Sequence, residues 1–361
     1  MTCTCRYTGH PFCIHFGIHR FRRGLPLTIR EELELREKEI LAPWASFSAE
    51  SKGRRFPEEQ CDIRPVFQRD RDRILHSKSF RRLKDKTQVF LSPDGDHYRT
   101  RMTHTLEVSQ NARTIAKALR LNEDLVEAIA LGHDLGHTPF GHAGERTLNR
   151  ICPEGFKHHE QSLRTVDLLE KNGAGMNLTE EVRDGILNHQ MYTVPFTLEG
   201  QIVKLSDKIA YIHHDMDDAI RGGILKESDV PEHIASVVGH TLGQRLDRFI
   251  HDIITTSKGK PVIAMSEEIE KAFHELREFM FESVYTNPLA KAEESRAEKM
   301  VEVLYEYYMN HLDALPELQK KMIDEGTSRD RAVCDYISSM TDRYAIKMFE
   351  SIYIPRTWDV F

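Results

Sequence analysis

The sequence of 361 residues lacks any long apolar run. No stretch approaches the roughly 20 consecutive apolar residues that a transmembrane helix needs. The N-terminus is polar and basic, with no apolar segment leading to a small-residue cleavage site. We therefore expect neither a membrane span nor a secretory signal, and we predict a cytoplasmic protein.

Cysteine is also scarce, and the six cysteines suggest no disulfide framework. Cys61, Cys152 and Cys334 are isolated, which is typical of a reduced cytosolic protein. The other three lie near histidines within the first 19 residues, but their spacing matches no known zinc finger. A loose N-terminal tail is the favoured interpretation of this segment, and a small zinc clip is the alternative.

Positive charge is not in excess, because 50 basic residues face 57 acidic ones and the formal net charge is -7. Bulk charge therefore excludes general polyanion binding, and any nucleotide or nucleic acid would need a local basic patch. Such a patch is present between Arg54 and Arg101. It has two interpretations that the sequence leaves open, a salt-bridged helix surface or a wall that faces phosphate.

The apolar residues recur mostly with helical spacing, so we predict an all-α fold. A charged helix is expected over 28–41, and the segments 101–121 and 199–220 are strongly periodic. At most a small β-hairpin is expected, formed by Val89–Leu91 and the residues near Tyr98. Further helices are predicted over 123–131, 159–171, 179–189, 231–256, 266–285, 289–313, 316–325 and 329–350.

No internal repeat or low-complexity linker divides the chain. We predict three regions: an N-terminal extension with a charged helix over 1–50, a catalytic core over 51–225, and a helical C-terminal region over 226–361 that packs on the core.

The stretch from Ala130 to Glu145 has the composition of a functional site. It places five side chains that bind metal or move protons within thirteen positions, namely His133, Asp134, His137, His142 and Glu145. Three glycines and a proline lie between them, so the backbone is expected to turn here rather than continue as one helix.

Two residues elsewhere complete a candidate metal site. His104 lies within a predicted helix, and Asp207 lies on the periodic helix 199–220. Together with His133 and Asp134 they offer two nitrogens and two carboxylates, a set that suits Mn²⁺, Mg²⁺, Fe²⁺, Zn²⁺ or Ni²⁺ and leaves positions open. The dipeptide His251-Asp252 lacks such neighbours, and we treat it as a decoy.

Several longer motifs carry a family resemblance, which runs from about residue 50 to 350. They are Phe80-Arg-Arg-Leu-Lys-Asp-Lys-Thr-Gln88, Arg101-Met-Thr-His104, His133-Asp-Leu-Gly-His-Thr-Pro-Phe-Gly-His-Ala-Gly-Glu145, His159-Glu160-Gln161-Ser162, Ser206-Asp-Lys-Ile-Ala-Tyr-Ile-His-His-Asp215 and Asp335-Tyr-Ile-Ser-Ser-Met-Thr-Asp-Arg-Tyr344. In combination they resemble the HD-domain deoxynucleoside triphosphate triphosphohydrolases, and in particular the bacterial dGTPase-like proteins.

The resemblance implies an HD-domain helical bundle that hydrolyses dGTP or several dNTPs to deoxynucleoside and inorganic triphosphate. It implies a divalent metal ion on the four ligands described above. It also implies that His142, with Glu145 as its orienting carboxylate, protonates the leaving 5′-oxygen. His137 and His159 would line the triphosphate, although each taken alone could equally be a helix-end or core histidine.

The resemblance further implies a set of substrate contacts. Arg101 and Lys208 would bind the triphosphate, and Tyr211 would pack on the sugar. Gln88 and Asp215 would bond the 3′-hydroxyl, and the apolar Val89 would exclude a 2′-hydroxyl. His213 and His214 match no ligand, and we interpret them as structural.

Two other functions stay open. One is another HD-type phosphohydrolase, such as a nucleotidase or a cyclic-nucleotide or alarmone hydrolase. The other is a nucleic-acid-binding regulatory protein on the same scaffold, for which the basic stretch leaves room. The resemblance also implies a homo-oligomer, a tetramer or a hexamer, with a dNTP or single-stranded DNA as a possible effector.

Overall fold

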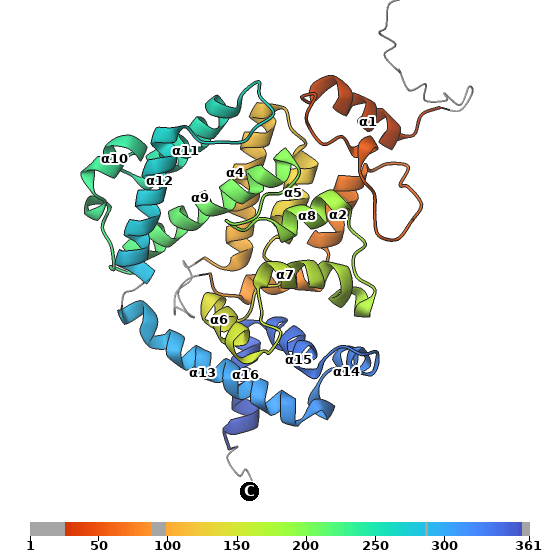
Figure 1. Cartoon of the computed structure of the whole chain (residues 1–361), viewed down its shortest axis with the longest axis vertical. Coiled ribbons are helices and arrows are strands. Elements are labelled where there is room, and N and C mark those ends of the chain that lie inside the picture. Colours follow the sequence, from red (N-terminus) through yellow and green to blue (C-terminus); the bar gives the residue numbers. More distant parts are fainter. Residues whose placement is uncertain (1–25, 89–98, 286–287, 356–361) are drawn as a thin grey trace, which may run out of the picture.

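The computed structural model describes residues 26–88, 99–285 and 288–355, and these residues are arranged as helices joined by turns (Figure 1). Among the described residues there is no strand, and only the isolated bridges Arg54–Thr179 and Thr87–Thr100 pair backbone in the antiparallel β manner. The all-α prediction is confirmed. The segments of the predicted hairpin and the cysteines of the N-terminal tail lie outside the described residues. None of the described helices has both the length and the apolar character needed to cross a membrane.

Helix α1 (Ile29–Ile40) begins and ends as its sequence predicts. The side chain of Thr28 accepts a hydrogen bond from the backbone N–H of Glu31, and the Glu31 carboxylate accepts one from Thr28 N–H at 2.8 Å. This reciprocal pair satisfies two of the backbone donors that every helix leaves unpaired at its start. The helix stops at Ile40, three residues before Pro43.

The core bundle is organised around three helices, α4 (Arg101–Leu119), α5 (Glu123–Gly132) and α9 (Leu198–Arg221), which pack on one another. Asn122 caps α5 and Thr197 caps α9 with their side-chain oxygens. Two shorter helices, α2 (Val66–Leu75) and α8 (Glu180–Leu187), cover α5, and α3 (Lys78–Arg82) follows α2. Helices α2 and α3 were not predicted from the sequence.

Helix α9 presents one face to the core and another to the predicted site. Ile202, Ile209, Ile212 and Met216 are buried, which confirms the predicted apolar stripe. Asp207 lies between these positions on a different side of the helix. A helix with 3.6 residues per turn separates these two faces, so one helix can serve the core and the site at once.

Two of the predicted C-terminal helices are each divided in two. The predicted helix 231–256 is α10 (Glu232–Val238) and α11 (Leu242–Ser257), separated at Gly239, whose φ of 113° no right-handed helix tolerates. The predicted helix 329–350 is α15 (Arg329–Ser338) and α16 (Asp342–Tyr353), and Thr341 caps the second of these. In both cases a local cap interrupts an apolar pattern that runs on through the break.

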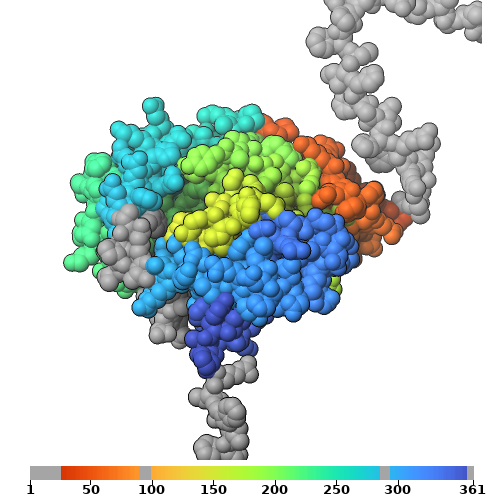
Figure 2. Space-filling view, turned by 60° about the horizontal axis from the view of Figure 1, so that its bottom comes forward, coloured from red at the N-terminus to blue at the C-terminus, as the bar shows by residue number. Residues whose placement is uncertain are grey.

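The buried apolar residues form two clusters. The first extends from Ala45 to Val284 and includes α10, α11 and α12 (Glu267–Met280). The second is built from α13 (Pro288–Asn310), α15, α16 and α6 (Gly141–Ile151), with α14 (Glu317–Asp324) packed on α15. Figure 2 shows α6 in yellow bordered by the blue C-terminal helices. The segment that follows the predicted metal ligands therefore packs on the C-terminal region, while the ligands themselves belong to the first bundle.

Asp342, at the start of α16, joins the two clusters near the predicted site. Its carboxylate accepts hydrogen bonds from the backbone N–H of Thr87 and of Phe140, each at 2.9 Å. Thr87 precedes the predicted sugar contact Gln88, and Phe140 lies in the predicted turn between His133 and Glu145. One buried carboxylate of the C-terminal region thus holds two segments of the site in place.

We expect Asp342→Ala to lower the free energy of unfolding by about 2–4 kcal/mol, because it leaves two inward-facing N–H groups without an acceptor. Urea unfolding measured by circular dichroism tests this. The matched control is Asp324→Ala, an exposed aspartate at the end of α14, which should change stability by less than about 0.5 kcal/mol. Equal small effects of both changes would contradict the role of Asp342.

Candidate functional site

The four predicted metal ligands lie together where α4, α5 and α9 meet. His104 is on α4, His133 and Asp134 follow the last turn of α5, and Asp207 is on α9. His104 Nε2 lies 3.2 Å from Asp207 Oδ1, and His133 Nε2 lies 3.7 Å from the same oxygen. The ligand atoms of His104, His133 and Asp134 all fall within 4.8 Å of one another.

The protonation of His133 fits a metal ligand. Its Nδ1 lies 2.7 Å from the carbonyl oxygen of Ala130, so Nδ1 carries the proton and donates it there. Nε2 is therefore left with a lone pair, and this buried atom has no hydrogen-bond partner among the described residues. An unpartnered buried nitrogen beside two carboxylates is the environment that a divalent cation completes.

The two carboxylates are held in the charged form that a metal ligand requires. Burial alone would raise the pKa of Asp134, but the Arg101 guanidinium and the neighbouring histidines hold it well below its usual range. Burial would also raise the pKa of Asp207, but the charge of Lys208 holds it well below its usual range. Arg101 Nη1 contacts Asp134 Oδ2 at 2.7 Å, and Lys208 Nζ contacts Asp207 Oδ2 at 3.1 Å.

Glycine sets the path of the turn that follows Asp134. A Cβ atom at Gly136 would lie 2.1 Å from the backbone nitrogen of Ser162, so only glycine allows α7 (His158–Arg164) to pack this closely. The Ser162 hydroxyl accepts from Gly136 N–H at 2.9 Å and donates to the His133 carbonyl at 2.7 Å. The chain then reverses through Phe140 and Gly141, whose φ values are 62° and 57°, and α6 begins.

A second group of titratable residues lies beside the metal ligands. The His137 ring stacks on His158 with centroids 4.7 Å apart, and the His142 ring lies 5.4 Å from His137. Glu145 joins them, with Oε1 at 2.8 Å from His158 Nδ1 and Oε2 at 3.4 Å from His142 Nδ1. His137 is buried, whereas the His142 side chain is 48% exposed, so His142 is the member that solvent or a ligand can reach.

Electrostatics separates the roles within this group. Burial opposes ionisation of Glu145, but His158 and the hydrogen bond with His142 hold the pKa of its carboxyl far below the usual range. Burial, followed by the charge of Arg101, lowers the pKa of His137 well below its ordinary value. The group therefore contains a permanent carboxylate and a neutral buried imidazole.

The structure places His158, rather than the predicted His159, against His137 and Glu145. His159 is partly buried and contacts the rings of His158 and His189, at 5.7 and 6.3 Å. Adjacent residues of a helix point about 100° apart, so the register of α7 decides which histidine faces the site. The His-His doublet signalled that one of them would do so but not which one.

His189 and Gln190 are further residues of the site that were not predicted from the sequence. His189 is buried, and its ring lies 5.2 Å from that of the predicted ligand His133. Its Nδ1 donates to the Ile186 carbonyl at 2.7 Å, as His133 does to Ala130. Gln190 Nε2 lies 2.7 Å from His158 Nε2 and holds that ring in place. No spacing in the sequence relates this pair to the HD segment.

Arg101 and Gln88 border the turn at Gly141. A Cβ at Gly141 would lie 3.3 Å from the Gln88 carbonyl oxygen and 3.4 Å from Arg101 Nη2. Both side chains are buried, and Arg101 Nε, Arg101 Nη2 and Gln88 Oε1 have no hydrogen-bond partner among the described residues. Val89, the predicted neighbour of Gln88, lies outside the described residues.

The predicted sugar contacts are on α9. Tyr211 lies one helical turn after Asp207, and its ring is 6.1 Å from that of His142. Asp215 lies one further turn along and is fully buried. Tyr211 therefore lies beside the second group of titratable residues and one helical turn from the predicted ligand Asp207.

In the dipeptide His251-Asp252, the aspartate has a structural role. The Asp252 carboxylate accepts from the backbone N–H and the hydroxyl of Ser266, at 2.8 and 2.7 Å, at the start of α12. His251 is exposed. These contacts agree with its interpretation as a decoy.

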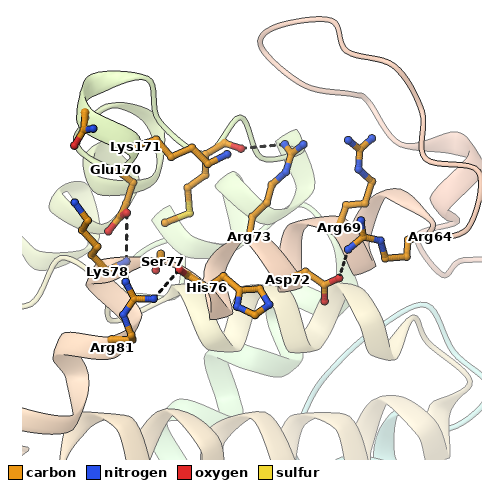
Figure 3. Close-up of a pocket in the computed structure, with 12 residues that line it drawn as sticks. Arg64, Arg69, Asp72, Arg73, His76, Ser77, Lys78, Arg81, Glu170 and Lys171 are labelled. Carbon is orange, nitrogen blue, oxygen red and sulfur yellow. Dashed lines mark hydrogen bonds and ion pairs between the residues drawn. The ribbon is translucent and has the colours of Figure 1, made fainter.

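Ion pairs within the protein account for much of the basic stretch. Arg54, Arg69 and Arg73 contact Glu58, and Arg64 contacts Asp72 at 2.7 Å. Figure 3 shows several of these arginines around a cavity of about 510 Å³ over α2, and none of the predicted metal ligands lines this cavity. The salt-bridged interpretation therefore holds for these side chains.

Lys86 is a fully buried lysine beneath the site. Its Nζ donates to the carbonyl oxygens of His137 and, at 2.7 Å, Ser338. It thus connects the turn that follows Asp134 to the end of α15. Burial, aided by the charge of Arg82, lowers the pKa of Lys86 to about 7.

This shifted pKa predicts a pH dependence of stability. Between about pH 7 and pH 10 the unfolded chain holds a proton on Lys86 that the folded chain releases, so unfolding becomes harder as pH rises. Compared with Lys86→Met, wild-type protein should gain up to roughly 1.4 kcal/mol per pH unit in this window. Urea unfolding of both proteins at several pH values checks this, and parallel curves would contradict it.

Comparisons with known proteins agree with this geometry. Residues 101–212 match the HD domain family, and residues 263–351 match the phosphohydrolase-associated domain family. A solved structure of a hypothetical protein from Aquifex aeolicus overlaps with a TM-score of 0.45 at 19% identity, covering 79% of this chain and 71% of that one, a likeness too weak to carry an argument.

Curated relatives match over almost their whole length. A deoxyguanosinetriphosphate triphosphohydrolase-like protein from Caldanaerobacter subterraneus subsp. tengcongensis is 55% identical over 92% of this chain and 98% of its own. Proteins of the same name from Clostridium perfringens and Desulfatibacillum aliphaticivorans are 50% and 48% identical, each over 91% of this chain and 99% of their own. The chain therefore belongs to the family of the deoxyguanosinetriphosphate triphosphohydrolase-like proteins.

Proposed function

We propose that the protein hydrolyses deoxynucleoside triphosphates, dGTP or several dNTPs, to deoxynucleoside and inorganic triphosphate in a reaction that depends on a divalent metal ion. Its membership of the family and the printed names of its relatives support the substrate class. The arrangement of the described residues supports the reaction type.

One observation carries the proposal. Buried side-chain atoms without a hydrogen-bond partner among the described residues gather at this site, and leaving such atoms unpaired is costly unless a ligand completes them. They are Gln88 Oε1, Arg101 Nε and Nη2, His133 Nε2, and both ring nitrogens of His137. Donors and an imidazole lone pair together fit a phosphate chain and a cation.

The metal ion would be held by His104, His133, Asp134 and Asp207. When bound, Mn²⁺, Mg²⁺, Fe²⁺, Zn²⁺ or Ni²⁺ at such a set lowers the pKa of a water ligand and polarises a phosphoryl oxygen. The set contains no thiolate and no closed cysteine cage, in keeping with a catalytic rather than a structural site.

The triphosphate would be bound by the cations and imidazoles around the ligands. Arg101 offers Nε and Nη2 while Nη1 stays on Asp134, so it can bind phosphate without leaving the metal site. Lys208 lies beside Asp207 in the same way on α9. His137 and His158 line the space next to Arg101, and we propose His158 rather than His159 as the second phosphate-facing imidazole.

The leaving 5′-oxygen needs a proton, and His142 is the residue placed to give it. Its side chain is half-exposed, its Nδ1 is oriented by Glu145 at 3.4 Å, and Tyr211 lies against it. A carboxylate that stays charged keeps the imidazole in one orientation. Glu145 therefore acts as the orienting base of this pair.

Sugar recognition is proposed for the stripe on α9 and for the segment at Gln88. Tyr211 would pack on the deoxyribose, and Asp215 and Gln88 would bond its 3′-hydroxyl. Val89 would crowd a 2′-hydroxyl, which the site would then reject for lack of room and of a partner. We also propose that the protein is a homo-oligomer, a tetramer or a hexamer. Its effector would be a dNTP or single-stranded DNA. The catalytic core would extend from residue 51 to residue 225, between the N-terminal extension and the helical C-terminal region.

A mixture of the four dNTPs, incubated with purified protein and Mn²⁺, tests the proposal by chromatography of the products. We expect deoxynucleoside and triphosphate in equal amounts, and no turnover after chelation of the metal. Monophosphate with pyrophosphate would show a different phosphohydrolase. Absence of turnover with salt-sensitive DNA binding would indicate the regulatory alternative.

A further inference from the structure

His214, on α9, contacts the predicted metal ligand His104 from the side opposite to Asp207. The Nδ1 atoms of the two rings lie 3.2 Å apart, whereas His104 Nε2 lies 3.2 Å from Asp207 Oδ1. His214 is buried, and its Nε2 contacts the Glu107 carboxylate. A chain of three side chains thus runs from the protein surface at Glu107 to the metal site.

The hydrogen bonds of this chain can be assigned because two nitrogens in contact need one proton between them. A carboxylate only accepts, so His214 Nε2 carries a proton and donates it to Glu107. In a neutral imidazole that carries its proton on Nε2, Nδ1 has a lone pair. His214 Nδ1 then accepts a hydrogen bond from His104 Nδ1–H. Of the possible arrangements, this one leaves His104 Nε2 with a lone pair that faces Asp207.

His133 reaches the same state by a different route. Its Nδ1 donates to the Ala130 carbonyl, a backbone acceptor that is always available, and its Nε2 is free to bind a cation. His104 is the fourth residue of α4, where the carbonyls are already used by the N–H groups of the helix, so its Nδ1 needs a side-chain acceptor. His214 supplies that acceptor when Glu107 fixes its protonation.

We propose that Glu107 and His214 are positioning residues that fix the tautomer of His104 and so present its Nε2 to the metal ion. The inference rests on the proposed metal site. It concerns neither substrate nor reacting atoms, and His214 acts only through His104. Outer partners of this kind typically change metal affinity by about 10- to 100-fold.

The experiment is a calorimetric titration of metal-free protein with Mn²⁺. We expect His214→Ala and Glu107→Ala each to weaken Mn²⁺ binding by about 10- to 100-fold. We expect His214→Asn to retain most of the affinity, because its amide oxygen stands near the position of Nδ1 and can accept from His104. His213 neighbours His214 but does not belong to the series of contacts from Glu107 through His214 to His104. His213→Ala should therefore leave the affinity within about twofold of wild type.

Glu107→Ala keeps the test independent of folding. The Glu107 side chain is 39% exposed, and its other partner, Arg99, keeps ion pairs with Asp217 and Asp218 at 2.6 and 3.2 Å. Thermal unfolding of the metal-free proteins accompanies the titration. A Glu107→Ala protein with an unchanged Tm and weaker Mn²⁺ binding supports the inference.

The outcomes separate this inference from the proposed function. Failure of wild-type protein to bind Mn²⁺, Mg²⁺ or Fe²⁺ would overturn the metal site and the inference with it. Wild-type binding together with unchanged affinity in Glu107→Ala and His214→Ala would overturn the inference alone. An equal loss in His213→Ala would also overturn it, since the effect would then belong to α9 as a whole.

Discussion

Asp207→Ala is expected to abolish Mn²⁺ binding and dNTP turnover together. Oδ1 of Asp207 lies 3.2 Å from Nε2 of His104 and 3.7 Å from Nε2 of His133. Its loss removes one negative charge and one ligand from a buried cation, so we expect a decrease in kcat/KM of about 1,000-fold or more. Calorimetry with Mn²⁺ and the product assay measure the two effects on the same protein.

The matched control is Asp252→Ala, which removes the carboxylate of the other His-Asp dipeptide. It loses the contacts with Ser266 at the start of α12 and should cost about 1 kcal/mol of stability while binding and turnover persist. Turnover by Asp207→Ala at a rate close to that of wild type would show that the metal ligands are wrongly assigned.

His142→Ala is expected to separate metal binding from catalysis. Among the described residues, the His142 ring contacts Glu145, His137 and Tyr211 but none of the four predicted ligands, so Mn²⁺ should bind with unchanged affinity. Loss of the proton donor should slow the chemical step by about 100-fold or more. Single-turnover kinetics at saturating dNTP measures that step directly.

The control for this change is His251→Ala, which removes an exposed imidazole of α11. It should leave the single-turnover rate and the metal affinity as in wild type. If His142→Ala reacts as fast as wild type, another group protonates the leaving oxygen. If it loses Mn²⁺ instead, His142 belongs to the metal site.

Much of the fold follows from periodicity and capping. The apolar stripe on α9 and the Asn122 cap of α5 are readable because local sequence and tertiary packing demand the same helix. The breaks at Gly239 and before Thr341 were missed because the apolar pattern continues across them. A glycine or a capping threonine between two apolar runs signals a break, and here that signal outweighs periodicity.

The candidate site was predictable to the extent that its residues share helices. His104 lies one turn after Arg101 and Tyr211 lies one turn after Asp207, so spacing alone places each pair on one face. Which of His158 and His159 faces inward depends on a helix register that the doublet does not fix. Glu107 shares the helix α4 with His104, but its link runs through His214 on another helix.

Contacts between distant segments were beyond reach of the sequence. Asp342 bonds the backbone of Thr87 and Phe140, which are 255 and 202 positions away. Backbone N–H groups have no sequence signature, and one aspartate among many gives no sign of accepting from them. The same holds for Lys86, whose side chain contacts the carbonyls of His137 and of Ser338 at the end of α15.

The most direct test of the proposed reaction is hydrolysis of a dNTP in ¹⁸O-labelled water with Mn²⁺, followed by mass spectrometry of both products. Attack of water on the α-phosphorus with departure of the 5′-oxygen predicts one ¹⁸O atom in inorganic triphosphate and none in the deoxynucleoside. Label in a nucleoside monophosphate, or release of pyrophosphate or single phosphates in place of triphosphate, would contradict the proposed function.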